Sequence, residues 1–200
     1  MTQELGTGRH PRRRFVAAAA VGVGALLGTG GRSLGEVALG ARPTHAGDEA
    51  IFRFALQLET LQARFYADAV DRGALRGELR EFAEVVGEHE KLHVEAVAEA
   101  AGRPVPTTQF DFRGATATPS AFAKAASLLE ELGVGAYNGV LANLTPSSIS
   151  LAMRIVSVEA RHAAWIRDLV GMPPAPRPAD PGEGATAVSA ELARLGFRRK

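Results

Sequence analysis

Apolar residues recur every three or four positions in four stretches of this chain, a spacing typical of amphipathic helices. The expected helices cover about residues 48–71, 75–101, 119–143 and 146–169. Start and stop residues agree with these limits. Gly102 and Pro104 follow the second stretch, and Thr145 and Pro146 open the fourth as N-cap and first helical residue.

A long connection separates the second helix from the third. Residues 103–118 contain two prolines, Gly114 and several threonines, interrupted by Phe110 and Phe112, and we expect them to drape across the bundle as a loop. This order predicts an all-α fold, an antiparallel four-helix bundle with a long crossover between helices 2 and 3. An Ala-rich helical repeat is the competing architecture, but no shorter period recurs.

A pattern of polar residues occurs twice within these helices. In each copy a Leu-Glu pair is followed by a Tyr seven residues after the Glu, and by Glu-x-x-His about thirty residues later. The copies are Leu58, Glu59, Tyr66, Glu90 and His93, and Leu129, Glu130, Tyr137, Glu159 and His162. Two helices with one Glu each, and two with a Glu/His pair, supply the ligands of di-iron and di-manganese carboxylate bundles.

Helical phase separates these residues from ordinary surface acids. At about 100° per residue, Glu90 lies within the apolar arc of its helix and Glu88 lies opposite. Glu130 borders its apolar stripe, whereas Glu131 points outward. Core-facing carboxylates are costly unless they are paired or bind a cation. The expected ligands of two iron or manganese ions are Glu59, Glu90, His93, Glu130, Glu159 and His162.

Tyr66 and Tyr137 are the only tyrosines, and each follows a Glu of the pattern by two helical turns. Three roles stay open for them: hydrogen-bond donors to that Glu, one-electron relays, or aromatic residues at the edge of the core with a polar tip. His89 lies at the margin of its apolar stripe, so we expect it to be partly exposed. Trp165 is expected to pack.

The two ends of the chain differ from its helical middle. Residues 12–15 read Arg-Arg-Arg-Phe and precede an uncharged apolar stretch, an order that resembles a twin-arginine export signal. Residues 1–46 are therefore expected to be a signal peptide and junction, with a basic helix that begins the domain as the alternative. Residues 172–200 are expected to form a Pro-rich linker and a short, peripheral amphipathic tail.

Composition narrows the chemistry further. The chain has no Cys, which excludes disulfides, thiolate metal sites, iron–sulfur clusters and cysteine nucleophiles. Its net charge is +1, with basic residues concentrated at both ends, so the middle offers no broad electropositive face and nucleic acid is not an expected partner. Any metal must be held by His and carboxylate.

Several segments resemble the ferritin-like superfamily, and more narrowly the exported bacterial ferritin-like proteins related to desiccation-associated proteins. These segments are FALQLE (54–59), FY (65–66), EKLH (90–93), LE (129–130), GVGAY (133–137) and VEARHAA (158–164). Over about residues 47–171, the resemblance implies a bundle that houses a di-iron site with the six ligands given above. Cage-type storage is not favoured, since the chain lacks the acidic clusters of cage ferritins.

The pattern and the resemblance favour an exported protein that binds two iron or manganese ions and reacts them with dioxygen or peroxide. Such an oxidase or peroxidase would protect against oxidative stress or desiccation in the periplasm, the cell envelope or outside the cell. Two alternatives stay open: a non-catalytic bundle braced by its metals, and a dimanganese catalase. The native metal, the substrate, membrane association through an uncleaved leader and homodimer formation also stay open.

Overall fold

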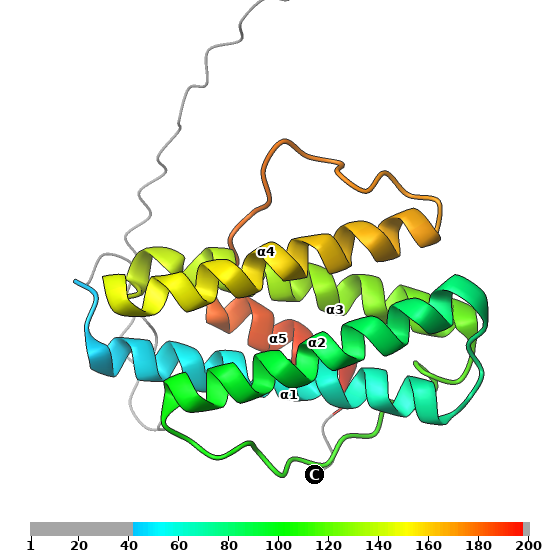
Figure 1. Ribbon diagram of the computed structural model, residues 1–200, viewed down its shortest axis with the longest axis horizontal. Helices are drawn as coiled ribbons and strands as arrows, with labels where there is room; N and C mark the ends of the chain where they lie inside the picture. The colour runs from blue at the N-terminus through cyan, green and yellow to red at the C-terminus, as the bar shows by residue number, and fades with distance from the viewer. Residues whose placement is uncertain (1–41, 198–200) are drawn as a thin grey trace, which may run out of the picture. The chain divides into compact units, whose positions relative to one another are not determined.

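Residues 42–197 are described by the computed structural model, and they form helices with no β-strand among them (Figure 1). The helices are α1 (His45–Asp71), α2 (Gly77–Ala101), α3 (Pro119–Val140), the short 3₁₀ helix η1 (Leu141–Asn143), α4 (Pro146–Leu169) and α5 (Ala185–Leu195). The all-α bundle predicted from the hydrophobic pattern is confirmed.

The four long helices pack as two hairpins. α1 packs mainly against α2, and α3 packs mainly against α4. The helices of each hairpin run in opposite directions (Figure 1). The crossover from α2 returns along the bundle before α3 begins, so that α2 and α3 run in the same direction (Figure 1). This arrangement lets all four helices contribute side chains to one interior.

Capping residues mark several of the helix limits. The hydroxyl of Thr44 accepts a 3.0 Å hydrogen bond from the amide of Gly47, and the hydroxyl of Thr118 accepts one of 3.2 Å from Ala121. α2 ends at Gly102, whose φ of 58° is readily adopted by glycine. The third helix was predicted to continue to residue 143, but its α-helical part ends at Val140 and the last turn tightens into η1.

Asp48 links the beginning of α1 to the beginning of α4. Its carboxylate accepts hydrogen bonds from the amide of Thr145 at 2.9 Å, the hydroxyl of Thr145 at 2.5 Å and the hydroxyl of Ser148 at 2.7 Å. Thr145 is the N-cap residue of α4, as predicted, but its hydroxyl donates to Asp48 and makes no capping hydrogen bond to the helix. Pro146 does occupy the first turn of α4.

Aromatic side chains fill one end of the bundle. Phe65, Tyr66, Phe82 and Phe122 are all fully buried. Phe112 comes from the crossover and packs edge-on against Phe65, with ring centroids 5.5 Å apart. Burial of these large rings is a major source of the hydrophobic stabilisation of this end. The crossover thus drapes across the bundle, as predicted.

The C-terminal segment is not peripheral, contrary to the sequence-based prediction. Val188 of α5 is 0% exposed and Phe197 is buried. The backbone amide of Asp111 donates a 2.7 Å hydrogen bond to the carbonyl of Phe197, which ties the tail to the crossover. The amphipathic pattern was read correctly, but periodicity alone does not tell which apolar face finds a partner.

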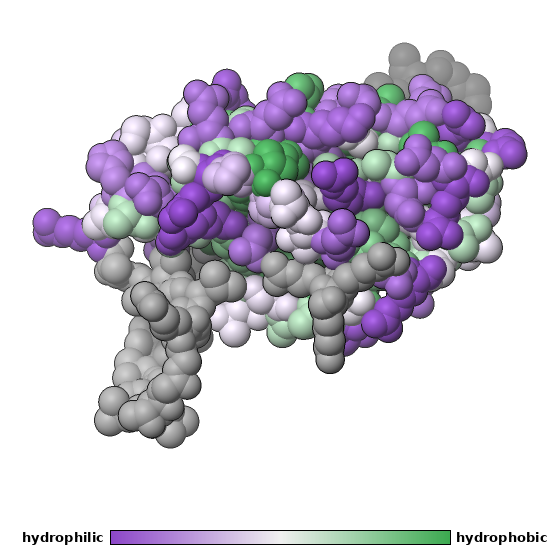
Figure 2. Space-filling view, turned by 90° about the horizontal axis from the view of Figure 1, so that it is seen from below, coloured by the Kyte–Doolittle hydropathy of each residue, from purple (hydrophilic) through white to green (hydrophobic). Residues whose placement is uncertain are grey.

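Residues 1–41 of the expected signal peptide and junction, 1–46, lie outside the described part of the chain, and α1 begins within the expected junction, at His45. Within the described part, no helix combines the length and the apolar character needed to cross a membrane. On the face shown in Figure 2, hydrophobic residues lie scattered among hydrophilic ones. Single exposed apolar residues of this kind are ordinary on protein surfaces.

Candidate metal centre

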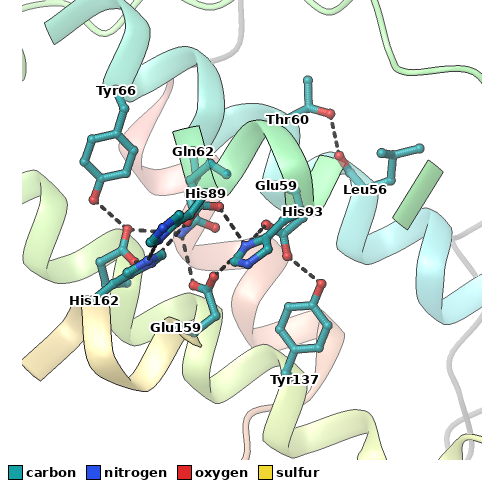
Figure 3. Close-up of polar contacts among 12 residues, drawn as sticks. Leu56, Glu59, Thr60, Gln62, Tyr66, His89, His93, Tyr137, Glu159 and His162 are labelled. Atoms are coloured by element: carbon teal, nitrogen blue, oxygen red, sulfur yellow. Dashed lines mark hydrogen bonds and ion pairs between the residues drawn. The ribbon is translucent and has the colours of Figure 1, made fainter. Parts of the chain in front are cut away.

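The four glutamates of the duplicated pattern lie inside the bundle, one on each long helix. They are Glu59 on α1, Glu90 on α2, Glu130 on α3 and Glu159 on α4, each at most 1% exposed. His93 and His162 lie one turn further along α2 and α4 and are also buried. Several of these side chains can be seen pointing toward one another in Figure 3. All six sequence-predicted residues therefore meet in one buried place.

The six residues form two overlapping groups. One contains Glu59, Glu90, His93 and Glu159, and the other contains Glu90, Glu130, Glu159 and His162. Within each group, one potential ligand atom per residue lies within 4.8 Å of the others. Glu90 and Glu159 belong to both groups. Each group also has one carboxylate and one imidazole of its own, and could hold a metal ion.

Each imidazole turns its Nδ1 atom toward the carboxylates. Nδ1 of His93 lies 3.1 Å from Oε1 of Glu159 and 3.4 Å from Oε2 of Glu59. Nδ1 of His162 lies 3.2 Å from Oε2 of Glu130. The His93 contacts are close but lack hydrogen-bond geometry, so they are electrostatic. Nδ1 is thus the nitrogen that each histidine presents to a cation.

Several buried polar atoms of the cluster have no hydrogen-bond partner among residues 42–197. They are Oε2 of Glu59, Oε1 of Gln62, both carboxylate oxygens of Glu90, Nδ1 of His93 and Oε1 of Glu159. Such atoms are costly in a folded interior unless something compensates them. A donor set of carboxylate oxygen and imidazole nitrogen, without sulfur, suits divalent iron or manganese. The residues present therefore fit a metal pair.

Burial raises the pKa of Glu90 and of Glu159 well above the ordinary value, and the neighbouring carboxylates raise it further. For His93, burial lowers the pKa, but the surrounding Glu159, Glu59 and Glu90 outweigh burial and raise it to about 12. Both effects favour bound protons in this cluster. A cation that binds to the same atoms must displace those protons.

The two tyrosines hold the carboxylates of the opposite hairpin. The hydroxyl of Tyr66 donates a 2.6 Å hydrogen bond to Oε1 of Glu130, and that of Tyr137 donates one of 2.5 Å to Oε1 of Glu59. Sequence reasoning had allowed hydrogen bonds to the Glu on the same helix, so the partner differs. Burial, followed by the nearby carboxylates, raises the pKa of both tyrosines well above the ordinary value. Both remain protonated donors.

Residues 47–172 match the ferritin-like domain family. The chain belongs to this family. Among curated proteins, none matches the chain. The ferritin-like assignment agrees with the all-helical fold and with a buried Glu/His cluster that could hold metal ions.

Sequence reasoning missed two features of this ferritin-like centre on the inner faces of α1 and α3. Nε2 of Gln62, fully buried, donates to Oε1 of Glu130 at 3.2 Å and to Oε2 of Glu159 at 3.4 Å. A Cβ atom on Gly133 would overlap Oε2 of Glu159. Gln62 and Gly133 occupy the same place in the two copies of the pattern, three residues after the Glu, and this correspondence was the available signal.

His89 was expected to be only a partly exposed residue, and it is half-buried. Its Nδ1 also lies 2.9 Å from Nε2 of His162, a contact that helical phase did not reveal. Burial, followed by the neighbouring His162, His93 and Arg161, lowers the pKa of His89. Glu131 was placed correctly outside the cluster, but it forms an ion pair with the buried Arg167 of α4. Glu88 is exposed and pairs with Lys91, as its phase predicted.

Proposed function

We propose that this ferritin-like protein is exported and binds two iron or manganese ions, which react with dioxygen or peroxide in protection against oxidative stress or desiccation. The observation that supports it best is the convergence of four buried carboxylates and two imidazoles into two groups that share Glu90 and Glu159. Uncompensated carboxylates at 0–1% exposure are otherwise a large energetic burden on a small bundle.

Two ferrous ions bound there would supply the two electrons that, with two protons, reduce one hydrogen peroxide to two waters. The protein side chains would bind and orient the two ions. Tyr66 and Tyr137 each donate a hydrogen bond to one oxygen of Glu130 or Glu59, the glutamates that belong to one group only. The other oxygen of each faces an imidazole. Tyr66 packs against Phe82 and Phe122 beside the cluster, and the four carboxylates are at most 1% exposed. A centre this deeply buried favours small reactants.

Metal content is the first test. After anaerobic reconstitution with ferrous iron and removal of excess metal, we expect about two irons per chain by elemental analysis. Glu90→Gln removes a charge that both positions share, so it should lower the content below that of the unsubstituted chain. Glu88→Gln, two residues away on the exposed side of α2, is the matched control and should bind normally. Less than one iron per chain in the unsubstituted protein would refute the metal centre.

Reactivity is tested separately. Peroxide added to the ferrous protein without a reductant should be consumed at about one molecule per two irons, as the electron count requires. Sustained oxygen evolution from peroxide by the manganese form would instead identify a dimanganese catalase.

The deep burial of the centre also supports a non-catalytic role, in which the metals brace the fold. Bracing predicts no peroxide consumption by the loaded protein, together with a large loss of thermal stability when a chelator removes the metal.

The export part of the proposal depends on Arg12, Arg13 and the apolar stretch behind them. In a bacterium with an active twin-arginine pathway, the full chain should appear in the periplasm or culture medium. Joint substitution of Arg12→Lys and Arg13→Lys should retain it in the cytoplasm. Equal export of both forms would contradict a twin-arginine signal.

A further inference from the structure

His89 forms a close imidazole pair with His162 at one side of the centre. Nδ1 of His89 lies 2.9 Å from Nε2 of His162. The ring centroids are 5.2 Å apart and the ring planes 15° apart. With the nitrogens 2.9 Å apart, the rings therefore lie nearly edge to edge rather than face to face. The pair is drawn in Figure 3. His162 is therefore contacted on both nitrogens, since its Nδ1 lies 3.2 Å from Oε2 of Glu130.

The other histidine of the cluster has no equivalent partner from the corresponding position. His89 lies four residues before His93 on α2, and the residue four before His162 on α4 is Val158. The valine side chain has no nitrogen or oxygen with which to contact an imidazole. The duplicated pattern thus repeats the six candidate ligands but not this pair.

We infer that His89 is a positioning residue for the metal position formed by Glu130 and His162. This inference rests on the proposed metal centre. A histidine that binds a cation through Nδ1 carries its proton on Nε2, and in His162 that N–H points at Nδ1 of His89. By accepting this hydrogen bond, His89 fixes the tautomer and the ring orientation that present Nδ1 of His162 to the metal.

The two metal positions therefore differ in how they are supported. The position of Glu130 and His162 depends on His89, whereas the position of Glu59 and His93 does not. Loss of a partner that orients a metal-binding histidine typically lowers metal affinity by about 10- to 100-fold. Loss of His89 should lower it at one position only, and this selectivity separates positioning from a general effect on folding.

Manganese(II) binding to the full chain, followed anaerobically by isothermal titration calorimetry, tests this inference. The unsubstituted protein should bind about two ions. His89→Val introduces the residue that the other hairpin has at the corresponding position, Val158. This variant should bind one ion with the original affinity and the other with an affinity about 10- to 100-fold lower. His89→Gln offers an amide oxygen that can accept the same hydrogen bond and should recover most of the loss. Glu88→Gln should match the unsubstituted protein.

Three results would overturn the inference. These are unchanged affinity of His89→Val for both ions, an equal loss of affinity at both positions, and an affinity of His89→Gln as low as that of His89→Val. Any of these, with two ions still bound by the unsubstituted protein, leaves the metal centre standing and removes only the role of His89. Failure of the unsubstituted protein to bind manganese or iron would overturn the metal centre and this inference with it.

Discussion

Tyr137 on α3 donates a 2.5 Å hydrogen bond to Glu59 on α1 and not to Glu130, the glutamate of the pattern on its own helix. Tyr66 makes the reciprocal bond of 2.6 Å to Glu130. In both carboxylates Oε1 is held by a tyrosine, while Oε2 lies 3.2 to 3.4 Å from a histidine Nδ1. The crossed bonds join the two hairpins through the groups that would hold the metals, so stability and metal binding are linked.

The two tyrosines should differ in their effect on stability. Tyr137→Phe leaves Oε1 of Glu59 without its donor, which should lower the free energy of unfolding of the metal-free protein by about 1–3 kcal/mol. Tyr66→Phe should cost less, because Oε1 of Glu130 keeps the donor Gln62 at 3.2 Å. Urea denaturation of both variants measures the difference. A larger loss for Tyr66→Phe would contradict this assignment of hydrogen bonds.

Gly133→Ala should impair metal binding through the shared Glu159. The added Cβ would overlap Oε2 of Glu159, so the carboxylate must move. Gln62 need not move, because its Nε2 would lie 3.5 Å from the Cβ, at an ordinary contact distance. We expect weaker manganese binding at both positions and a loss of about 1–3 kcal/mol from overpacking. Without the overlap, Ala would stabilise the helix relative to Gly by about 1 kcal/mol.

Gly114→Ala is the control for this change, since a Cβ there meets nothing within 4 Å. Calorimetric titration with manganese should give the same affinities for Gly114→Ala and the unsubstituted chain. Normal binding by Gly133→Ala would show that Glu159 is not confined by α3.

The stability of the metal-free protein should fall as pH rises. Burial raises the pKa of Glu90 and Glu159, so their contribution is present below the ordinary value of 4.5 and is lost as pH rises toward the folded-state values. Burial opposes the shift of His93, but its carboxylate neighbours raise that pKa to about 12, so its contribution is lost between pH 6.5 and about 12. Both contributions to folding stability therefore decrease as pH rises.

Urea unfolding between about pH 5 and pH 9 checks this dependence. The affinity for manganese should change in the opposite direction. Because the metal competes with protons for the same atoms, its affinity should rise as pH rises. A metal-free protein that becomes more stable over this range would contradict the predicted protonation of the cluster.

Asp48 should protect the protein at mildly acidic pH. Burial raises its pKa, but the hydrogen bonds from Thr145 and Ser148 outweigh burial and hold the pKa below the ordinary value of 3.8. Its contribution is thus present above that value and is lost as pH falls through the lower folded-state pKa. Asp48→Ala should cost about 1–3 kcal/mol at neutral pH and reduce the remaining acid dependence. The exposed neighbour gives the control Glu49→Gln, which should be close to neutral.

Much of the fold was predictable because it depends on local spacing. Apolar residues at helical intervals predicted the four long helices, and Gly102 and Pro146 marked two of their limits to within a residue. The same periodicity distinguished Glu90 from Glu88. Local spacing did not reveal that α5 is buried, because burial depends on a partner surface that is distant in sequence.

The sequence by itself determined which side chains face inward and that they come in two equivalent sets, because helical phase and duplication can be read along one chain. Only the tertiary structure decided the partners across the bundle. These are the hydrogen bonds from each tyrosine to the glutamate of the opposite hairpin, those from Gln62 to Glu130 and Glu159, and the contact of His89 with His162. Those contacts join residues 64 to 97 positions apart. Their geometry follows from how the two hairpins dock, which no local pattern encodes.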